Sequence, residues 1–118
     1  MTTPQGIYGL YDWRNLPAPV TVGVSGTNAS RQLMTGAGLV IALCLQNDNA
    51  TTACRGLLLD GTDNTGYLIM PFGAAAGGNS NTGFPLPGLP FRIGLYARNI
   101  SGLYDLAVTY IPLIQPLW

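Results

Sequence analysis

The sequence predicts an all-β protein: a single β-sandwich or jelly-roll-like domain of six to eight short antiparallel strands with extended N- and C-terminal arms. Three observations favour this class. The chain contains no Lys and no Glu, which removes the strongest polar helix formers. It contains 16 Gly and 9 Pro, which interrupt helices and mark turns. Short apolar or alternating runs recur between turn residues. No apolar pattern with helical spacing is longer than two turns.

The chain divides into one domain and two terminal segments. Its 118 residues fit a single domain and are enough to bury a core. We expect residues 1–17 to form an extended N-terminal arm, because several large apolar residues lie there among prolines. Residues 18–111 hold the strands of the sandwich. Residues 112–118 form a C-terminal tail whose two prolines exclude it from a central strand.

Within the domain, the short apolar and alternating runs are typical of strands. The run at 39–46 is the most apolar and is expected to be buried on both faces. Pro71 lies near the end of another run and indicates an edge strand, because proline cannot donate a hydrogen bond to a neighbour. The expected strands cover residues 20–24, 31–34, 39–46, 54–59, 67–72, 91–98 and 104–110.

A first hairpin is expected around the polar residues 47–52. It would place Cys44 and Cys54 opposite each other on adjacent strands. Synthesis in the cytosol favours two reduced thiols over a disulfide, and both states stay open.

A long loop and a last hairpin are expected in the second half of the chain. Residues 73–90 show no periodicity, and a loop of this length is usually functional or packed against a partner. In the last hairpin the polar side chains share one face, with Asp105 opposite Tyr96 and within diagonal reach of Arg98. Arg92 and Arg98 should lie on an exposed face. Arginine suits pairing with carboxylates of another subunit, and pairing with Asp on the same strand face is the open alternative.

The composition argues against an enzyme. Without His there is no Ser-His-Asp triad and no imidazole metal site, and without Lys there is no Schiff base. No catalytic residue, cofactor or metal ligand is therefore predicted. The segment 60–66 superficially resembles a calcium loop but lacks its Gly at the sixth position and its Glu at the twelfth. A hairpin turn is favoured, with a weak cation site near Asp60 and Asp63 as the alternative.

The charge balance restricts the partners. Five Arg and five Asp carry all the charge, so the formal net charge is zero, which argues against nucleic acid and against an anionic membrane surface. The longest apolar stretch is about half the ~20 residues of a membrane helix, and no secretory signal is recognised. Only 8% of the residues are charged, and low charge promotes association. We therefore expect copies of the chain to cover much of its surface.

The large aromatic residues of the terminal segments are candidate interface residues. They are Tyr8, Tyr11, Trp13 and Trp118. The favoured interpretation is that the arms cross onto neighbouring subunits, because so much apolar surface would be a costly exposed patch on a monomer. The alternatives are arms that fold back onto their own domain and an aromatic platform that binds sugar.

Two stretches carry a resemblance to a known group of proteins. They are LLLDGT at 57–62 with Gly66 and Pro71, and FRIGLY at 91–96 followed after a turn by DLAVTY at 105–110. Over residues 38–111 the chain resembles small β-sandwich virion proteins of tailed bacteriophages, and most of all their head decoration, or cement, proteins. The aromatic N-terminal arm has no match in that group.

The resemblance implies a non-enzymatic virion protein that is made in the host cytoplasm and located on the capsid exterior. It implies a homotrimer that binds the major capsid protein and clamps neighbours with its arms, and it supplies no catalytic residues. Two other functions stay open. One is a phage tail or fibre module that binds host-surface glycan through the segment 73–90 and aromatic faces. The other is a cellular β-sandwich adhesin or lectin.

Overall fold

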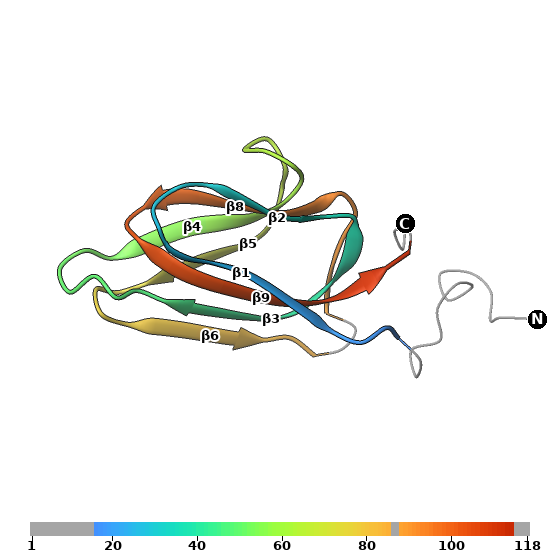
Figure 1. The fold of residues 1–118 in the computed structure, drawn as a ribbon, viewed down its shortest axis with the longest axis horizontal. Coiled ribbons are helices and arrows are strands. Elements are labelled where there is room, and N and C mark those ends of the chain that lie inside the picture. Colours follow the sequence, from blue (N-terminus) through green and yellow to red (C-terminus); the bar gives the residue numbers. More distant parts are fainter. Residues whose placement is uncertain (1–15, 86–87, 115–118) are drawn as a thin grey trace, which may run out of the picture.

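The computed structural model describes residues 16–85 and 88–114, which form two antiparallel β-sheets packed face to face (Figure 1). No helix among these residues could span a bilayer. The strands are β1 (Val20–Thr27), β2 (Arg31–Thr35), β3 (Ala37–Gln46), β4 (Cys54–Asp60), β5 (Tyr67–Ala74), β6 (Asn79–Gly83), β7 (Leu89–Phe91), β8 (Gly94–Ser101) and β9 (Tyr104–Leu113).

The strand pairs are nested along the chain. The first sheet has the order β1-β9-β3-β6, with β7 also paired to β3, and the second sheet has the order β2-β8-β4-β5. Thus β4 pairs with β5, β3 with β6 and β7, β2 with β8, and β1 with β9. From the innermost pair outward, successive strand pairs lie alternately in the second and the first sheet. This is the connectivity of a long hairpin rolled into two layers, which is the jelly-roll arrangement. The structure therefore confirms the all-β sandwich or jelly-roll class.

The main core fills the space between the two sheets. Apolar side chains alternate along the strands, so that one face of each strand points inward. Phe72 of the second sheet and Tyr104 of the first lie with ring centroids 5.4 Å apart, which joins the two layers. Phe91 and Tyr110 make a second ring contact at 5.9 Å. Burial of each such ring contributes about 2 kcal/mol or more.

A second apolar cluster lies on the outer face of the first sheet. It consists of Ala37, Leu39, Ile111 and Leu113. Val40 belongs to the inner core, so its neighbour Leu39 points to the opposite face. Leu39 is nevertheless 0% exposed. Of the side chains that the structure places, Leu16 and Ile41 pack against this outer-face cluster, so the chain that enters β1 begins on this surface.

The two expected hairpins do not form. β3 and β4 belong to different sheets, and so do β8 and β9, so each connection crosses between the layers. Cys44 pairs with Asn81 and Ala107, whereas Cys54 pairs with Ala74. The expectation was wrong because alternation specifies which side chains face the core but not which strand lies alongside.

The segment 73–90 is not one long loop, which corrects another expectation. β5 continues to Ala74, and both β6 and β7 lie within the segment. β6 is built from Asn, Ser, Thr and Gly, and it lies at an edge of the first sheet with every residue at least partly exposed. A polar edge strand of this kind has no apolar alternation for sequence reasoning to detect.

Two proline positions had opposite outcomes. Pro71 lies in β5, which is an outer strand of the second sheet, so the expected edge is confirmed. Pro112 lies within β9, a central strand, although the prolines of the tail were expected to prevent this. The pairing of β1 with β9 extends only to Tyr110, so at Pro112 the described neighbour is β3 alone. Locally, β9 is an edge there.

Candidate interaction surface

The four aromatic residues expected to form subunit contacts lie outside the described residues. They are Tyr8, Tyr11, Trp13 and Trp118. The described chain starts at Leu16 and stops at Ile114, and both points lie at the same end of the sandwich (Figure 1). Pairing explains this, because Val20 at the start of β1 lies opposite Tyr110 near the end of β9. Both terminal segments therefore leave the domain from one end.

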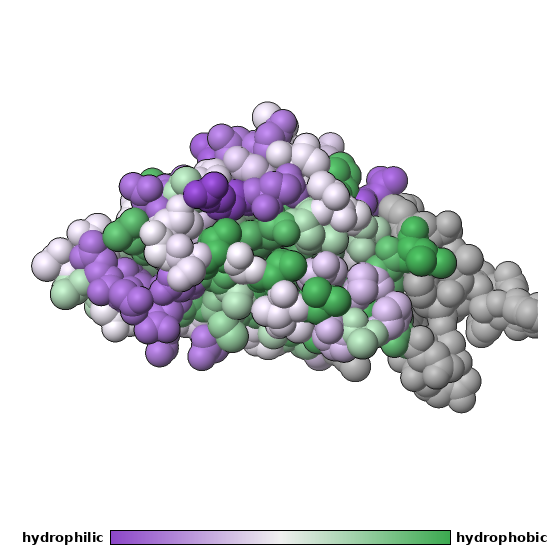
Figure 2. Space-filling model, in the orientation of Figure 1, coloured by the Kyte–Doolittle hydropathy of each residue, from purple (hydrophilic) through white to green (hydrophobic). Residues whose placement is uncertain are grey.

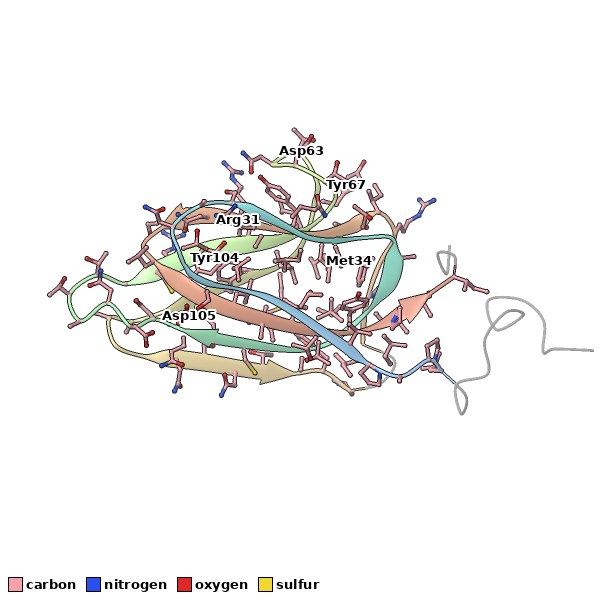
Figure 3. All side chains as sticks on the ribbon, viewed as in Figure 1. Arg31, Met34, Asp63, Tyr67, Tyr104 and Asp105 are labelled. Carbon is pink, nitrogen blue, oxygen red and sulfur yellow. The ribbon has the colours of Figure 1, made fainter. Side chains whose placement is uncertain are left out.

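Asp105 does not lie beside Tyr96 or Arg98, which corrects the expected register. Instead its Oδ1 accepts hydrogen bonds from the backbone nitrogen of Gly26 and from the Ser25 hydroxyl, the latter at 3.1 Å. These bonds, chiefly the one from Gly26, hold the pKa of Asp105 below its ordinary value, because they stabilise the charged carboxylate. Asp105 fastens the end of β1 to the start of β9 (Figure 3).

Arg92 and Arg98 are both exposed, as expected, but they lie in different places. Arg98 lies in β8 opposite Leu57 of β4, on the outer face of the second sheet. Arg92 lies between β7 and β8, where its backbone nitrogen donates to Asp60 at 2.9 Å. The two arginines and Asp105 are therefore not parts of one site.

Asp60 accepts hydrogen bonds from three consecutive backbone nitrogens. Its Oδ2 accepts from Arg92 at 2.9 Å, and its Oδ1 accepts from Ile93 at 2.7 Å and from Gly94 at 3.3 Å. The side chain is only 8% exposed. Asp60 therefore satisfies one buried and two partly buried N–H groups of the connection between β7 and β8, which is a structural role for a carboxylate.

Asp63 lies at the tip of the loop between β4 and β5, where it closes a local turn. Its Oδ1 accepts from the Thr65 backbone nitrogen at 2.8 Å and from the Thr65 hydroxyl at 2.5 Å. The hydroxyl bond and then the backbone bond hold the pKa of Asp63 below its usual range. Within residues 16–85 and 88–114, no three metal-ligating side chains come together. The hydrogen bonds of Asp63 are those of the hairpin turn that the sequence favours for this segment.

Both cysteines are free thiols on opposite sides of the first layer. Cys54 is buried in the core. Cys44 is exposed on the outer face of the first sheet, in a shallow hollow of about 300 Å³ that Asn79, Asn81 and Asp105 also line. Because β3 and β4 lie in different sheets, the two thiols do not face each other.

One end of the sandwich is apolar. Among the described residues, seven large hydrophobic side chains are exposed, and five of them lie at the end where the terminal segments join. These five, which we call the apolar end, are Val20, Tyr67, Leu68, Ile93 and Ile114. Tyr67 is 79% exposed and Ile114 is 86% exposed. Figure 2 shows hydrophobic surface across the middle of the visible face and at this end, with hydrophilic surface along the top and at the opposite end.

A groove of about 470 Å³ opens at the apolar end, between the edges of the two sheets. It is lined by Tyr67, Leu68 and Ile69 of β5, by Leu89 and Pro90 of β7, and by Asp60 and Arg92. Figure 3 shows Tyr67 next to the loop that carries Asp63. The volume falls in the range of pockets that bind small molecules or peptide side chains.

The start of β5 is an uncovered sheet edge beside this groove. β4 is the strand that pairs with β5 in the described part of the chain, so the other side of β5 has no strand neighbour there. Residues 67–70 carry no charge and no proline, which are the usual protection of an edge, and Pro71 acts only beyond them. The pairing register shifts between Leu58 and Leu59, which lie opposite Met70 and Leu68, and an irregularity of this kind increases the local twist of the strand. Such an edge is a template for another extended chain.

Sequence reasoning missed Tyr67, Leu68 and Ile93 as surface residues. The pattern assigns 67–72 to a strand, in which alternation would bury every second side chain. The available signal was a run of four consecutive apolar residues directly before a proline that marks an edge. The convergence with Ile93 follows from topology, since Asp60 at the end of β4 pairs with Tyr67 of β5 on one side and with Leu95 of β8 on the other.

The chemistry of the apolar end is that of a contact surface. It combines exposed apolar side chains, a groove and a free strand edge, while the nearby Asp60 carboxylate is already occupied by backbone donors. Exposed apolar side chains beside a groove are typical of interaction sites in soluble proteins. No family model and no curated protein sequence matches the chain.

Proposed function

We propose that the chain is a non-enzymatic structural protein of a virion, most simply a homotrimeric decoration protein that stabilises a phage capsid from outside. The observation that carries the proposal is the apolar end, where five exposed large hydrophobic residues lie at the end of the sandwich at which the described chain starts and stops. Leaving such surface in water costs about 25 cal/mol per Å², and an assembly removes that cost.

Two further features support this function. Jelly-roll sandwiches recur among viral capsid and lectin domains, which is support by fold analogy alone. The low charge is the second feature, because a protein with 8% charged residues and zero net charge has little to oppose its own association.

The distribution of polar loops suggests an orientation on the lattice. The loop between β3 and β4 and the loop between β5 and β6 lie away from the apolar end, and they are linked through Asn47, whose side chain donates to the backbone oxygens of Thr52 and Ala75. These loops are rich in Asn, Thr and Gly. We place the apolar end against neighbouring subunits and the major capsid protein, with the polar loops facing solvent.

The test begins with the molar mass of the full chain, measured by size exclusion with light scattering over a range of concentrations. A trimer is expected. The chain is then mixed with capsids assembled from a phage major capsid protein, and the bound fraction is measured by sedimentation. A protein that stays monomeric and remains in the supernatant at every concentration contradicts the proposal.

A glycan-binding tail or fibre module is the second candidate, favoured by one observation. Tyr67 presents a largely exposed ring at the mouth of the groove, close to Arg92, and aromatic faces with nearby polar groups suit sugars. Glycan-array binding that Tyr67→Ala abolishes, while the molar mass of the protein is unchanged, would favour this candidate over the capsid role.

A further inference from the structure

We infer that the groove between β5 and β7 receives the N-terminal segment of a second copy of this chain, residues 1–15, which adds to the free edge of β5. The inference rests on the proposed assembly function and deepens it, because it names the contact that holds the copies together. Its parts are an acceptor surface at the apolar end and a donor segment that precedes Leu16.

The acceptor surface has both components of β-strand addition. Among residues 16–85 and 88–114, no strand pairs with the outer side of β5 over residues 67–70, and main-chain hydrogen bonds to an added strand would supply affinity. The groove of about 470 Å³ next to this edge offers apolar walls from Leu68, Ile69 and Leu89, which supply pockets for side chains. An edge and a groove in the same place fit an extended apolar peptide better than a globular surface.

The donor segment has a matching composition. Residues 7–13 read IYGLYDW, with five large apolar residues and the single charge of Asp12. A segment of 15 residues spans up to about 50 Å when extended, which is long enough to reach a neighbouring domain. Tyr and Trp are also the residues that most often anchor protein interfaces.

The acceptor is open in the single chain. Tyr67 and Leu68 are 79% and 59% exposed, so their side chains stay available to another copy. Leu16 packs on the outer-face cluster of the first sheet, on Leu39 and its neighbours, which is a different surface from the groove. The described chain therefore starts on one surface of its own domain, whereas the proposed acceptor groove lies on another.

A donor and an acceptor on different surfaces make a heterologous contact. Each copy gives one segment and receives one, so the contact closes into a ring when the rotation between copies permits. This geometry is consistent with a trimer, and it explains how a chain with few charges can form a specific oligomer rather than an unlimited aggregate.

The test uses the full-length chain with the photoreactive amino acid p-benzoylphenylalanine in place of Leu68. This chain is mixed with full-length chain that lacks the probe and is uniformly ¹⁵N-labelled. After irradiation and trypsin digestion, residues 1–14 are released as one peptide, because the chain has no Lys and Arg14 is its first Arg. We expect this peptide to be cross-linked to position 68 in its ¹⁵N form. The matched control carries the probe at Leu103, exposed at the opposite end, and should give no such product.

Each outcome decides the inference. Cross-links to the ¹⁵N peptide support it, whereas cross-links confined to the peptide of the same chain, or equal yields from positions 68 and 103, overturn it. As a second measurement, Leu68→Arg in the full chain should raise the dissociation constant of the oligomer about tenfold or more, with Leu103→Arg unchanged. An unchanged constant for Leu68→Arg overturns the inference. If ¹⁵N cross-links form but the oligomer ignores capsids, the capsid function fails while this contact stands.

Discussion

The Asp60 carboxylate accepts a 2.7 Å hydrogen bond from the backbone nitrogen of Ile93, so the last residue of β4 fixes the connection that displays an exposed residue of the apolar end. The glycine that follows Asp60 takes part in the same contact, because the Gly61 nitrogen donates to the Gly94 oxygen at 3.2 Å. The position of the contact surface thus depends on a buried polar interaction rather than on apolar packing alone.

Replacing Asp60 tests this dependence. Asp60→Ala leaves three backbone donors without their acceptor, and we expect it to lower the free energy of unfolding by about 2–3 kcal/mol. Asp60→Asn should cost less, because its amide oxygen still accepts. Urea denaturation followed by circular dichroism measures both. Asp63→Ala is the matched control in an exposed turn and should change stability by no more than about 0.5 kcal/mol. Equal losses for Asp60→Ala and Asp63→Ala would contradict the assigned role.

Asn47 is a second buried polar anchor, at the opposite end of the sandwich. Its side chain donates to the oxygens of Thr52 at 2.8 Å and Ala75 at 3.2 Å and accepts from the Asn49 nitrogen at 3.0 Å. Asn47→Ala leaves these groups unpaired, so we expect a loss of about 2–3 kcal/mol in the free energy of unfolding, measured in urea. Asn81→Ala, on an exposed strand, is the control. A loss at Asn47 no larger than at Asn81 would show that the loops are not tied through this amide.

The strands could largely be predicted from the sequence, because alternation reports burial directly. In β9, Tyr104, Leu106 and Val108 point inward and Asp105 points outward, as the pattern indicates. The pairing of the strands could not be predicted, because one alternating strand suits many neighbours. The strand that follows β8 in the chain therefore lies in the other sheet, a placement that comes from global packing of the two layers.

The candidate site shows the same division. The scarcity of charge predicts that part of the surface is covered by partners, but it does not predict which part. The apolar end exists because the topology brings Tyr67, Ile93 and Ile114 to one end of the sandwich from three distant parts of the chain. The buried roles of Asp60 and Asn47 were also hidden, because both lie in turn-rich segments where a polar side chain is the ordinary occupant.

The hydrogen bonds of Asp105 make the stability pH-dependent in acid. The pKa of Asp105 is lower in the folded chain than its ordinary value of about 3.9, chiefly because of the bond from Gly26. The stability it contributes is present above that ordinary value and is lost as the pH falls through the lowered one. We expect the urea concentration at the unfolding midpoint of the native chain to decrease when the pH is lowered below about 4. The midpoint of Asp105→Asn should decrease less over the same range. Parallel pH profiles for the two chains would contradict this.

Tyr104 provides the corresponding test in alkali. Its hydroxyl donates to the Ala29 oxygen at 2.9 Å, and burial raises the pKa of Tyr104 above its usual value, because the phenolate would be poorly solvated. The bond is therefore present below the ordinary tyrosine pKa of about 10 and is lost as the pH rises through the raised value. Tyr104→Phe should cost about 1 kcal/mol at neutral pH.

The measurement for Tyr104 is the urea midpoint at several pH values together with the ultraviolet titration of phenolate. We expect the difference in stability between the native chain and Tyr104→Phe to shrink as the pH rises above about 10, since ionisation removes the donated proton. The ultraviolet titration of Tyr104→Phe should lack one tyrosine ionisation that the native chain shows, and that ionisation should be one that occurs at high pH. Tyr67→Phe, at a largely exposed position, is the control and should leave the stability within about 0.5 kcal/mol at neutral pH. A constant difference across the alkaline range would show that the Tyr104 hydroxyl makes no bond that depends on its proton.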